Sequence, residues 1–375
     1  MVLIAAFSHF FTDFFSAFFK PMAPYFMSLY QIDSSTFGST LGIIGSCASL
    51  LQIFFGLLFD RTKRDGWLLF SLLMFQLALL GLLVFIRHYA LLMLLIFLSI
   101  LINSAYHPLG AGMAGRTGKA RAVAIFSIFG TFGSALGPIF ITAFSSRFSF
   151  RDVAWIALAS GLVLTLLAPK FSPIKKEERA RQRFPTKSLF VLLMPCFNAV
   201  VLRTIVLDQF HILVPIYFDG LKAPLTLGGV VLAVGMLAGL VTNYAGSRWI
   251  LKVGVQRINL VGFLGMGIGG LLFLLAPGYV AKTLMFALFD SAGFLTMSAN
   301  VVQAQALVPN NLAFASSVTM GLAWAIGGYI GAFISVFLGN RVTMLLALLS
   351  AFSLGVALLY LFLIRNDRTR RPIAV

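Results

Sequence analysis

The sequence predicts an all-α integral membrane protein with twelve transmembrane helices in two pseudo-symmetric six-helix bundles. The 375-residue chain is 60% hydrophobic and only 10% charged, with a mean hydropathy of +0.98. A soluble protein of this size would have to leave much of that apolar surface exposed. Apolar segments long enough to cross a bilayer recur twelve times, with turn or charge clusters between them. A basic stretch in the middle of the chain divides these segments six plus six.

Each apolar segment is expected to form a helix, because a helix satisfies its own backbone polar groups inside the hydrocarbon. Several segments are long enough to require tilt or bending. Pro21 and Pro24 should kink the first helix, and Pro215 should kink the seventh. The expected spans are 2–30, 35–59, 66–86, 89–113, 122–145, 153–169, 188–218, 224–247, 256–276, 280–306, 312–338 and 342–364.

We interpret the basic stretch at 170–187 as a cytoplasmic linker between two domains. We expect an N-terminal bundle at 1–169, the linker at 170–187, a C-terminal bundle at 188–364 and a tail at 365–375. A weak internal repeat at an offset of 191 residues supports a duplicated six-helix unit. Transporters are often built from such repeats, with the substrate site at the repeat interface. The repeat pairs Pro24 with Pro215, Gly130 with Gly321, and Gly137 with Gly328.

The basic residues also predict orientation. With the N-terminus inside, the inner loops and tail hold 20 Lys and Arg residues, whereas the outer loops hold 6. This asymmetry predicts a multi-pass protein of the cell (inner) membrane with both termini cytoplasmic. The net charge of +17 is therefore explained by basic residues that indicate the topology and that form a surface for anionic lipid. Nucleic-acid binding is not expected. Cys47 and Cys196 lie in apolar runs and are expected to be unpaired packing residues.

The first span carries a polar face. His9, Thr12, Asp13, Ser16 and Lys20 fall on one side of a helix at offsets of three, four, seven and eleven residues. The opposite side is nearly all Phe, Ala and Met. A lipid-facing helix would not tolerate such a polar row, and an ionisable residue inside a membrane segment indicates a functional site.

Ionisable residues deep in the other spans are confined to three of them. Asp13 is expected to be the principal proton carrier, because burial and neighbouring charge can switch a carboxylate. His9 and His107 would tune or share that proton, since imidazole titrates near physiological pH. Asp290 is either a second proton site or a partner for Arg203. The complete set is His9, Asp13, Lys20, His107, Arg203, Asp208, His211 and Asp290.

Lys20 and Arg203 are candidates for holding an anionic substrate, and Arg suits a phosphonate or carboxylate in bidentate fashion. Asp208 and His211 are further substrate-binding candidates, with Asp208 either the counter-charge of Arg203 or a partner of His211. An alternative is that these groups form a fixed ion-pair network and that Lys20 snorkels to the interface. Tyr106, Asn103 and Asn300 are expected either to contact substrate or to bond neighbouring helices.

A loop motif carries a family resemblance. Gly56 lies in the last turn of the span 35–59, and Asp60, Arg61 and Arg64 follow directly after it. They resemble the loop 2–3 signature of the major facilitator superfamily, G-x-L-x-D-R-x-x-x-R, which implies a cytoplasmic latch on the outward-open state. In the second half, Asn243 stands where the acid would be, so the latch is expected on one side only.

Two further motifs narrow the resemblance. Gly133, Gly137 and Pro138 resemble the G-x-x-x-G-P motif of drug–proton antiporters, and physically they favour tight packing and a bend. His107-Pro108, together with His9 and Asp13, is similar to the fosmidomycin-resistance branch, which exports small, often anionic compounds. In the superfamily fold the first, fourth, seventh and tenth helices line the central cavity. These are the spans that carry the ionisable residues.

The predicted function is a proton-coupled secondary active transporter that exports a small, possibly anionic organic compound or drug by alternating access. The alternative is an importer or exchanger of organic anions without proton coupling. An integral-membrane enzyme or receptor is a remote third reading. No phosphate-binding loop is present, so no nucleotide or other cofactor is expected. The His/Asp set could bind a metal ion, but no compact ligand motif appears and none is expected. The expected partners are substrate, protons and lipid, with the chain a monomer.

Overall fold

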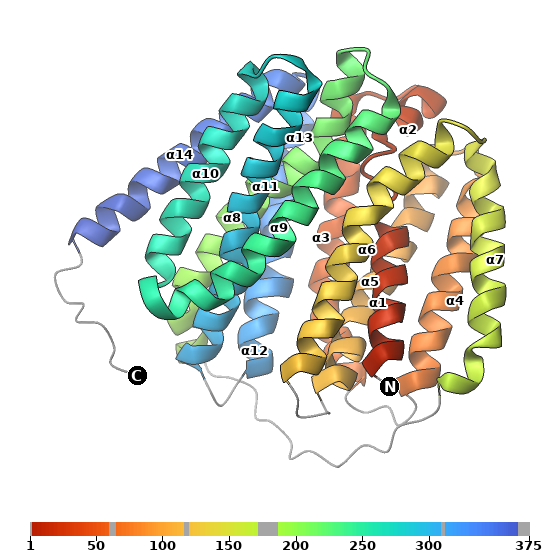
Figure 1. Cartoon of the computed structure of the whole chain (residues 1–375), viewed down its shortest axis with the longest axis horizontal. Coiled ribbons are helices and arrows are strands. Elements are labelled where there is room, and N and C mark those ends of the chain that lie inside the picture. Colours follow the sequence, from red (N-terminus) through yellow and green to blue (C-terminus); the bar gives the residue numbers. More distant parts are fainter. Residues whose placement is uncertain (1, 60–64, 116–119, 172–186, 309–311, 367–375) are drawn as a thin grey trace.

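The computed structural model describes residues 2–59, 65–115, 120–171, 187–308 and 312–366, and it contains helices and short connections but no strand within those ranges. Two groups of helices stand side by side, one from each half of the chain (Figure 1). We call the end that holds the N-terminus the inner end. The opposite end, where the short helix α2 lies, is the outer end.

The first six predicted spans are all helical. α1 and α2 together form the first span, and one helix forms each of the next five. The bounds are α1 Val2–Ser16, α2 Ala23–Tyr30, α3 Ser34–Phe59, α4 Asp65–Leu83, α5 Tyr89–Gly115, α6 Ala120–Ser145 and α7 Val153–Leu166. Short 3-10 turns at Phe150–Asp152 and Ala168–Lys170 flank α7.

The second six spans are helical as well. A π-helical segment, Ser317–Leu322, joins α12 to α13 in one span. Counted over both halves, nine helices of the described residues are long and apolar enough to cross a membrane. The predicted all-helical membrane architecture is confirmed. The bounds are α8 Lys187–Gly220, α9 Leu225–Val253, α10 Val255–Leu275, α11 Gly278–Leu307, α12 Leu312–Ser316, α13 Ala323–Leu338 and α14 Val342–Asn366.

The first span is broken rather than kinked, which corrects the sequence prediction. α1 ends at Ser16, residues 17–22 form turns, and α2 begins at Ala23 with Pro24 in its first turn. Pro21 lacks the N–H that would continue the helix past the break, whereas Pro24 lies in the first turn of α2, where proline is tolerated. Lys20 lies in this break and therefore does not continue the helical face of His9 and Asp13. By contrast, Pro215 lies inside an unbroken α8.

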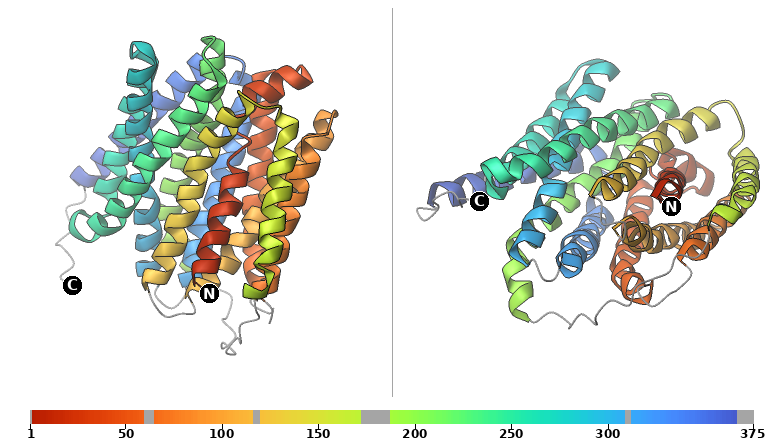
Figure 2. Two further views of the ribbon diagram at one scale, coloured as in Figure 1. Left: turned by 45° about the vertical axis from the view of Figure 1, so that its right-hand side comes forward. Right: turned by 60° about the horizontal axis from the view of Figure 1, so that its bottom comes forward.

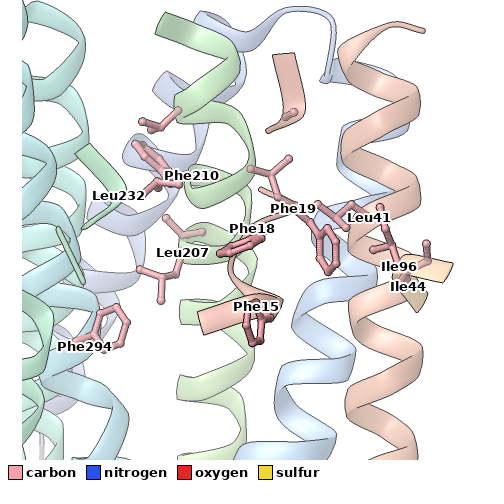
Figure 3. Packing of buried hydrophobic residues seen from close by; sticks show 14 of the residues in the cluster. Phe15, Phe18, Phe19, Leu41, Ile44, Ile96, Leu207, Phe210, Leu232 and Phe294 are labelled. Carbon is pink, nitrogen blue, oxygen red and sulfur yellow. The ribbon is translucent and has the colours of Figure 1, made fainter. Parts of the chain in front are cut away.

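Phenylalanine side chains pack around the break. Phe15, Phe18 and Phe19 are each no more than 2% exposed. Phe18 lies on the side of Leu207 from α8, and Phe19 lies on the side of Leu41 from α3 (Figure 3). This packing holds a segment without regular helical hydrogen bonds at the boundary between the two halves.

Glycines set the same helix pairing in both halves. A Cβ at Gly133 of α6 would overlap the backbone of Phe10 in α1, and a Cβ at Gly137 would overlap the carbonyl of Phe14. In the second half, Gly327 of α13 faces the backbone of Val201 in α8 in the same way. Small residues allow this close approach of backbones. The helix-packing reading of the Gly133–Gly137 motif is therefore correct for this structure.

The two halves meet along two pairs of helices, α3 with α13 and α6 with α9 (Figure 2). Gly42 of α3 lies against Ala332, and Gly229 of α9 lies against the carbonyl of Pro138 and the hydroxyl of Thr142. Cys47 and Cys196 are free, as expected, and the Cys47 sulfur lies 2.8 Å from the Tyr329 hydroxyl.

Hydrogen bonds also join the halves at the outer end. The Ser34 hydroxyl donates to the Gly339 carbonyl at 2.8 Å, and the Asn340 amide donates to Asp33 at 2.9 Å. The backbone N–H of Thr36 donates to the same carboxylate at 2.7 Å. These donors favour the charged form, so the pKa of Asp33 lies below its ordinary value, first because of Thr36 and then because of Asn340.

The α1–α6 contact should be sensitive to a single methyl group. We expect Gly133→Ala to destabilise the protein by about 1–3 kcal/mol, because the new Cβ overlaps the Phe10 backbone. The measurement is the melting temperature of the purified protein in detergent. Gly355→Ala is the matched control, because a Cβ there meets nothing within 4 Å. Equal melting of Gly133→Ala and the wild type would show that this contact is not tight.

Candidate functional site

Three of the predicted residues converge between α1 and α5. His9 and Asp13 lie one turn apart on α1, with His9 Nε2 at 3.4 Å from Asp13 Oδ2. His107 comes from α5, and its Nε2 lies 3.5 Å from Asp13 Oδ1. One ligand-type atom from each of the three residues falls within 4.8 Å of the others. The His9 side chain is 6% exposed and that of Asp13 is 12% exposed, so the cluster is largely shielded.

Hydrogen bonds fix the protons of both imidazoles. His9 Nδ1 lies 2.8 Å from the Phe126 carbonyl, and His107 Nδ1 lies 2.7 Å from the Asn103 carbonyl. A carbonyl oxygen can only accept, so each Nδ1 carries a hydrogen and donates it. In the neutral rings both Nε2 atoms then present lone pairs to the Asp13 carboxylate. Three electron-pair donors facing one another repel, and a proton or cation among them removes that repulsion.

The carboxylate is also held in place. The Asn103 amide donates to Asp13 Oδ1 at 2.7 Å, and the Ser134 hydroxyl of α6 donates to Oδ2 at 3.3 Å. Asn103 was expected either to contact substrate or to bond a neighbouring helix, and in this structure its amide bonds Asp13 of α1. Ser134 was missed, because a serine in an apolar helix carries no distinguishing signal in the sequence.

The His9 ring occupies a closely fitted position. It stacks on Phe126 with ring centroids 3.9 Å apart and lies 5.9 Å from the ring of Tyr106. A Cβ at Gly130 would overlap the imidazole, so glycine is needed there. The Tyr106 hydroxyl donates to the Ala5 carbonyl at 2.9 Å and ties α5 to α1. Tyr106 therefore supports the cluster from a fully buried position.

A second titratable pair lies within the other half. His211 Nε2 of α8 lies 2.7 Å from Asp290 Oδ1 of α11. Asp290 is fully buried, and its Oδ2 has no hydrogen-bond partner. A Cβ at Gly235 of α9 would overlap that oxygen, so glycine leaves room for it. Asp290 was predicted to be either a second proton site or a partner of Arg203. In this structure its contact is with His211 and not with Arg203.

Asp208 forms an ion pair that crosses between the halves. Lys20 Nζ, from the break in the first span, lies 2.5 Å from Asp208 Oδ1. Of the predicted partners, Arg203 and His211 both lie close enough for their charges to interact with Asp208, but neither makes the direct ion pair, which Lys20 makes instead. Arg203 lies five residues away on a different face of α8, and His211 is engaged by Asp290. The true partner is 188 residues away in sequence, a distance that spacing on one helix cannot reveal.

Arg203 is a buried cation with free donors. Its side chain is 3% exposed, and its Nε and Nη1 atoms have no hydrogen-bond partner. The guanidinium carbon lies 5.5 Å from the ring centroid of Trp324 in α13, a cation–π contact. Trp324 was missed by the sequence analysis. A buried guanidinium with unused N–H groups can accept an anionic group from a ligand.

The remaining predicted residues lie elsewhere. Asn300 exchanges hydrogen bonds with Asn259 of α10 at 2.8 and 3.2 Å, which is the helix-bonding alternative considered for it. Gln76 of α4, another missed residue, bonds Thr12 and Ser16 of α1. The predicted latch residues Asp60, Arg61 and Arg64 lie outside the described residues, and Gly56 lies in α3.

The structure therefore gathers three titratable groups in the first half, two in the second, and one ion pair between the halves. All of these groups come from the first, fourth, seventh and tenth spans. Each cluster places imidazole nitrogen beside a carboxylate. Arg203 can bind an anion.

Comparison with known proteins agrees with this architecture. The sequence matches the family model described as Major Facilitator Superfamily over residues 5–331. Comparison with curated protein sequences gave no match.

Solved transporter structures share the fold across nearly the whole chain. A mutant of the nucleoside transporter NupG superposes with a TM-score of 0.79 at 15% identity, covering 96% of this chain and 99% of that chain. A mutant of the peptide transporter POT gives 0.77 at 16% identity, covering 97% and 94%. A bacterial homologue of the human lysosomal transporter Spinster, inward-facing and occupied, gives 0.74 at 14% identity, covering 97% and 96%.

These identities are low enough that the three structures support the fold alone. The family match covers most of the sequence, and the helix arrangement agrees with it. The chain is thus a multi-pass membrane transporter rather than an enzyme, and it belongs to the Major Facilitator Superfamily.

Proposed function

We propose that this transporter is proton-coupled and exports a small anionic organic compound by antiport. The observation that carries the proposal is the arrangement of His9, Asp13 and His107. Both Nδ1 atoms donate to carbonyls, so both Nε2 lone pairs face one carboxylate. A single proton there converts repulsion into a charge-assisted contact. Uptake and loss of that proton would change how tightly α1 is held to α5.

Asp290 and His211 supply a second proton site in the other half. Their 2.7 Å contact is fully buried, and it lies on α8 and α11, the counterparts of α1 and α5. A proton on either group changes the charge of a site that has little access to water. Coupling would arise if the two buried sites exchange protons with opposite sides of the membrane as the halves move.

The conformation bears on how the halves move. The hydrogen bonds of Ser34 and Asp33 with Gly339 and Asn340 support assigning this structure to the state closed at the outer end. The Lys20–Asp208 ion pair also crosses between the halves. α6 and α9 lie side by side near the outer end and separate toward the inner end (Figure 1). The charge asymmetry of the loops supports placing the inner end, with both termini, in the cytoplasm of a cell with an inner membrane.

Arg203 supports an anionic substrate. The Asp208 charge lies nearby, but the buried Nε and Nη1 atoms of Arg203 have no hydrogen-bond acceptor, which is costly, and an incoming phosphonate or carboxylate would supply the missing acceptors. Lys20 would reach the same substrate if its ion pair with Asp208 opens during transport. The resemblance of the first half to drug–proton antiporters and to the fosmidomycin-resistance branch agrees with export. A growth-resistance screen against phosphonates and carboxylates would identify a compound for the assays below.

Proton coupling is tested with Asp13→Asn in proteoliposomes. We expect an imposed pH gradient to drive transport by the wild type, and we expect Asp13→Asn to reduce this to the level of protein-free liposomes, because an amide cannot take up the proton. Asp219→Asn, which changes an exposed carboxylate at the end of α8, is the matched control and should transport normally. Gradient-driven transport that survives in Asp13→Asn would remove Asp13 from the coupling mechanism.

Anion recognition is tested with Arg203→Gln. Loss of charge-assisted hydrogen bonds should weaken the apparent affinity for an anionic substrate about tenfold or more. The readout is the concentration dependence of transport in the same proteoliposomes. The control is Arg248→Gln, whose guanidinium lies over Tyr244 at 4.9 Å on the exposed side of α9. An unchanged affinity in Arg203→Gln would assign the anion site elsewhere.

A second candidate function is exchange of organic anions without protons. The two cations Lys20 and Arg203 favour it, because they could rebind a counter-anion on each cycle. Exchange predicts that unlabelled substrate on the opposite side accelerates efflux from loaded liposomes, and that a pH gradient has no effect. Proton antiport predicts acceleration by the gradient in the absence of opposing substrate. These opposite outcomes distinguish the two functions.

A further inference from the structure

We propose that His9, Asp13 and His107 form a binding site for a divalent transition-metal ion of the zinc class. This inference concerns the cluster to which the proposed function assigns a proton, and the experiment below separates the two. The sequence contained only the pair His9 and Asp13 at a helical spacing. The third donor, His107, comes from a helix 94 residues further along the chain and is brought in by the fold.

The distances fit a metal ion. Zinc binds imidazole nitrogen at about 2.0–2.1 Å and carboxylate oxygen at about 2.0–2.2 Å, so ligand atoms in a tetrahedral site lie about 3.3–3.5 Å apart. His9 Nε2 lies 3.4 Å from Asp13 Oδ2, and His107 Nε2 lies 3.5 Å from Asp13 Oδ1. The widest separation among the three donor atoms is no more than 4.8 Å. The His107 side chain is 33% exposed, so this ligand lies at the open side of the cluster.

Neighbouring groups hold the three metal-ligand side chains in place through hydrogen bonds. Metal-binding imidazoles usually donate their second N–H to a carbonyl or carboxylate, which fixes the ring and its tautomer. His9 does this with Phe126 and His107 does it with Asn103. Asn103 and Ser134 also hold the two Asp13 oxygens. Independently, His9 Nε2 is buried without a hydrogen-bond partner, in a side chain that is 94% shielded.

The donor set selects the class of ion. Two imidazoles and one carboxylate suit zinc, cobalt, nickel, copper or ferrous iron. Calcium and magnesium require more oxygen ligands than this cluster offers. Three protein ligands leave a position open for water or substrate, unlike a closed structural site. The bound ion would use the same electron pairs as the coupling proton, so metal and proton would exclude one another.

The test is cobalt binding to the full-length protein in lipid nanodiscs. Co²⁺ is titrated and followed by its visible absorption, and Zn²⁺ is then added to displace it. We expect one Co²⁺ per chain. His107→Gln and His9→Gln should each weaken binding at least about tenfold. The controls are His88→Gln, which changes an exposed residue, and His211→Gln, which changes a buried histidine facing a single carboxylate. Both controls should bind Co²⁺ like the wild type.

Absence of binding to the wild type at millimolar Co²⁺, or equal binding by His107→Gln, would overturn the proposal. Melting temperatures show whether each variant is folded. If His9→Gln unfolds, His107→Gln decides, because its ring is partly exposed and less involved in packing. If the wild type binds no metal, and Asp13→Asn abolishes gradient-driven transport, the proposed function stands and the metal site is rejected. If the wild type binds metal, and Asp13→Asn leaves gradient-driven transport unchanged, the metal site stands and the proposed proton coupling is rejected.

Discussion

The structure depends on how one carboxylate is shared by two imidazoles inside a membrane helix bundle. Asp13 faces His9 and His107, and backbone carbonyls of Phe126 and Asn103 fix both rings so that their Nε2 atoms point toward it. With no cation among them these donors repel, and with one they attract. The contact between α1 and α5 therefore responds to the binding of a single positive charge.

Packing makes this arrangement possible. Gly130 gives space to the His9 ring, and Gly133 brings the backbones of α1 and α6 together one turn further along. In the second half a glycine on a different helix, Gly235 of α9, gives space to Asp290. The break before α2 places Lys20 opposite Asp208, so the halves are joined by an ion pair where the first helix loses its regular hydrogen bonds. Breaks of this kind are tolerated in membranes where the chain is buried in protein.

Much of this could be predicted from the sequence, and the limits have physical reasons. Hydropathy and loop charge locate helices because the bilayer demands length and apolarity. Ionisable residues in apolar spans mark the site because they are costly there. Pairing is different, since Lys20 with Asp208 and His211 with Asp290 depend on tertiary contacts between distant segments. The spacing on α8 identified two charges near Asp208, Arg203 and His211, but it could not reveal Lys20 as the direct ion-pair partner. Supporting residues such as Ser134, Gln76 and Trp324 resemble ordinary packing residues until the helices are placed.

The central claim is that Asp13 and its two histidines hold an exchangeable positive charge. The most direct measurement is ¹⁵N NMR of the histidine side chains in lipid bilayers, assigned with His9→Gln and His107→Gln. In metal-free protein the account predicts Nδ1–H in both rings, together with an additional proton at one Nε2 that is lost in Asp13→Asn. Two neutral rings whose signals do not change on removal of the Asp13 carboxylate would contradict it.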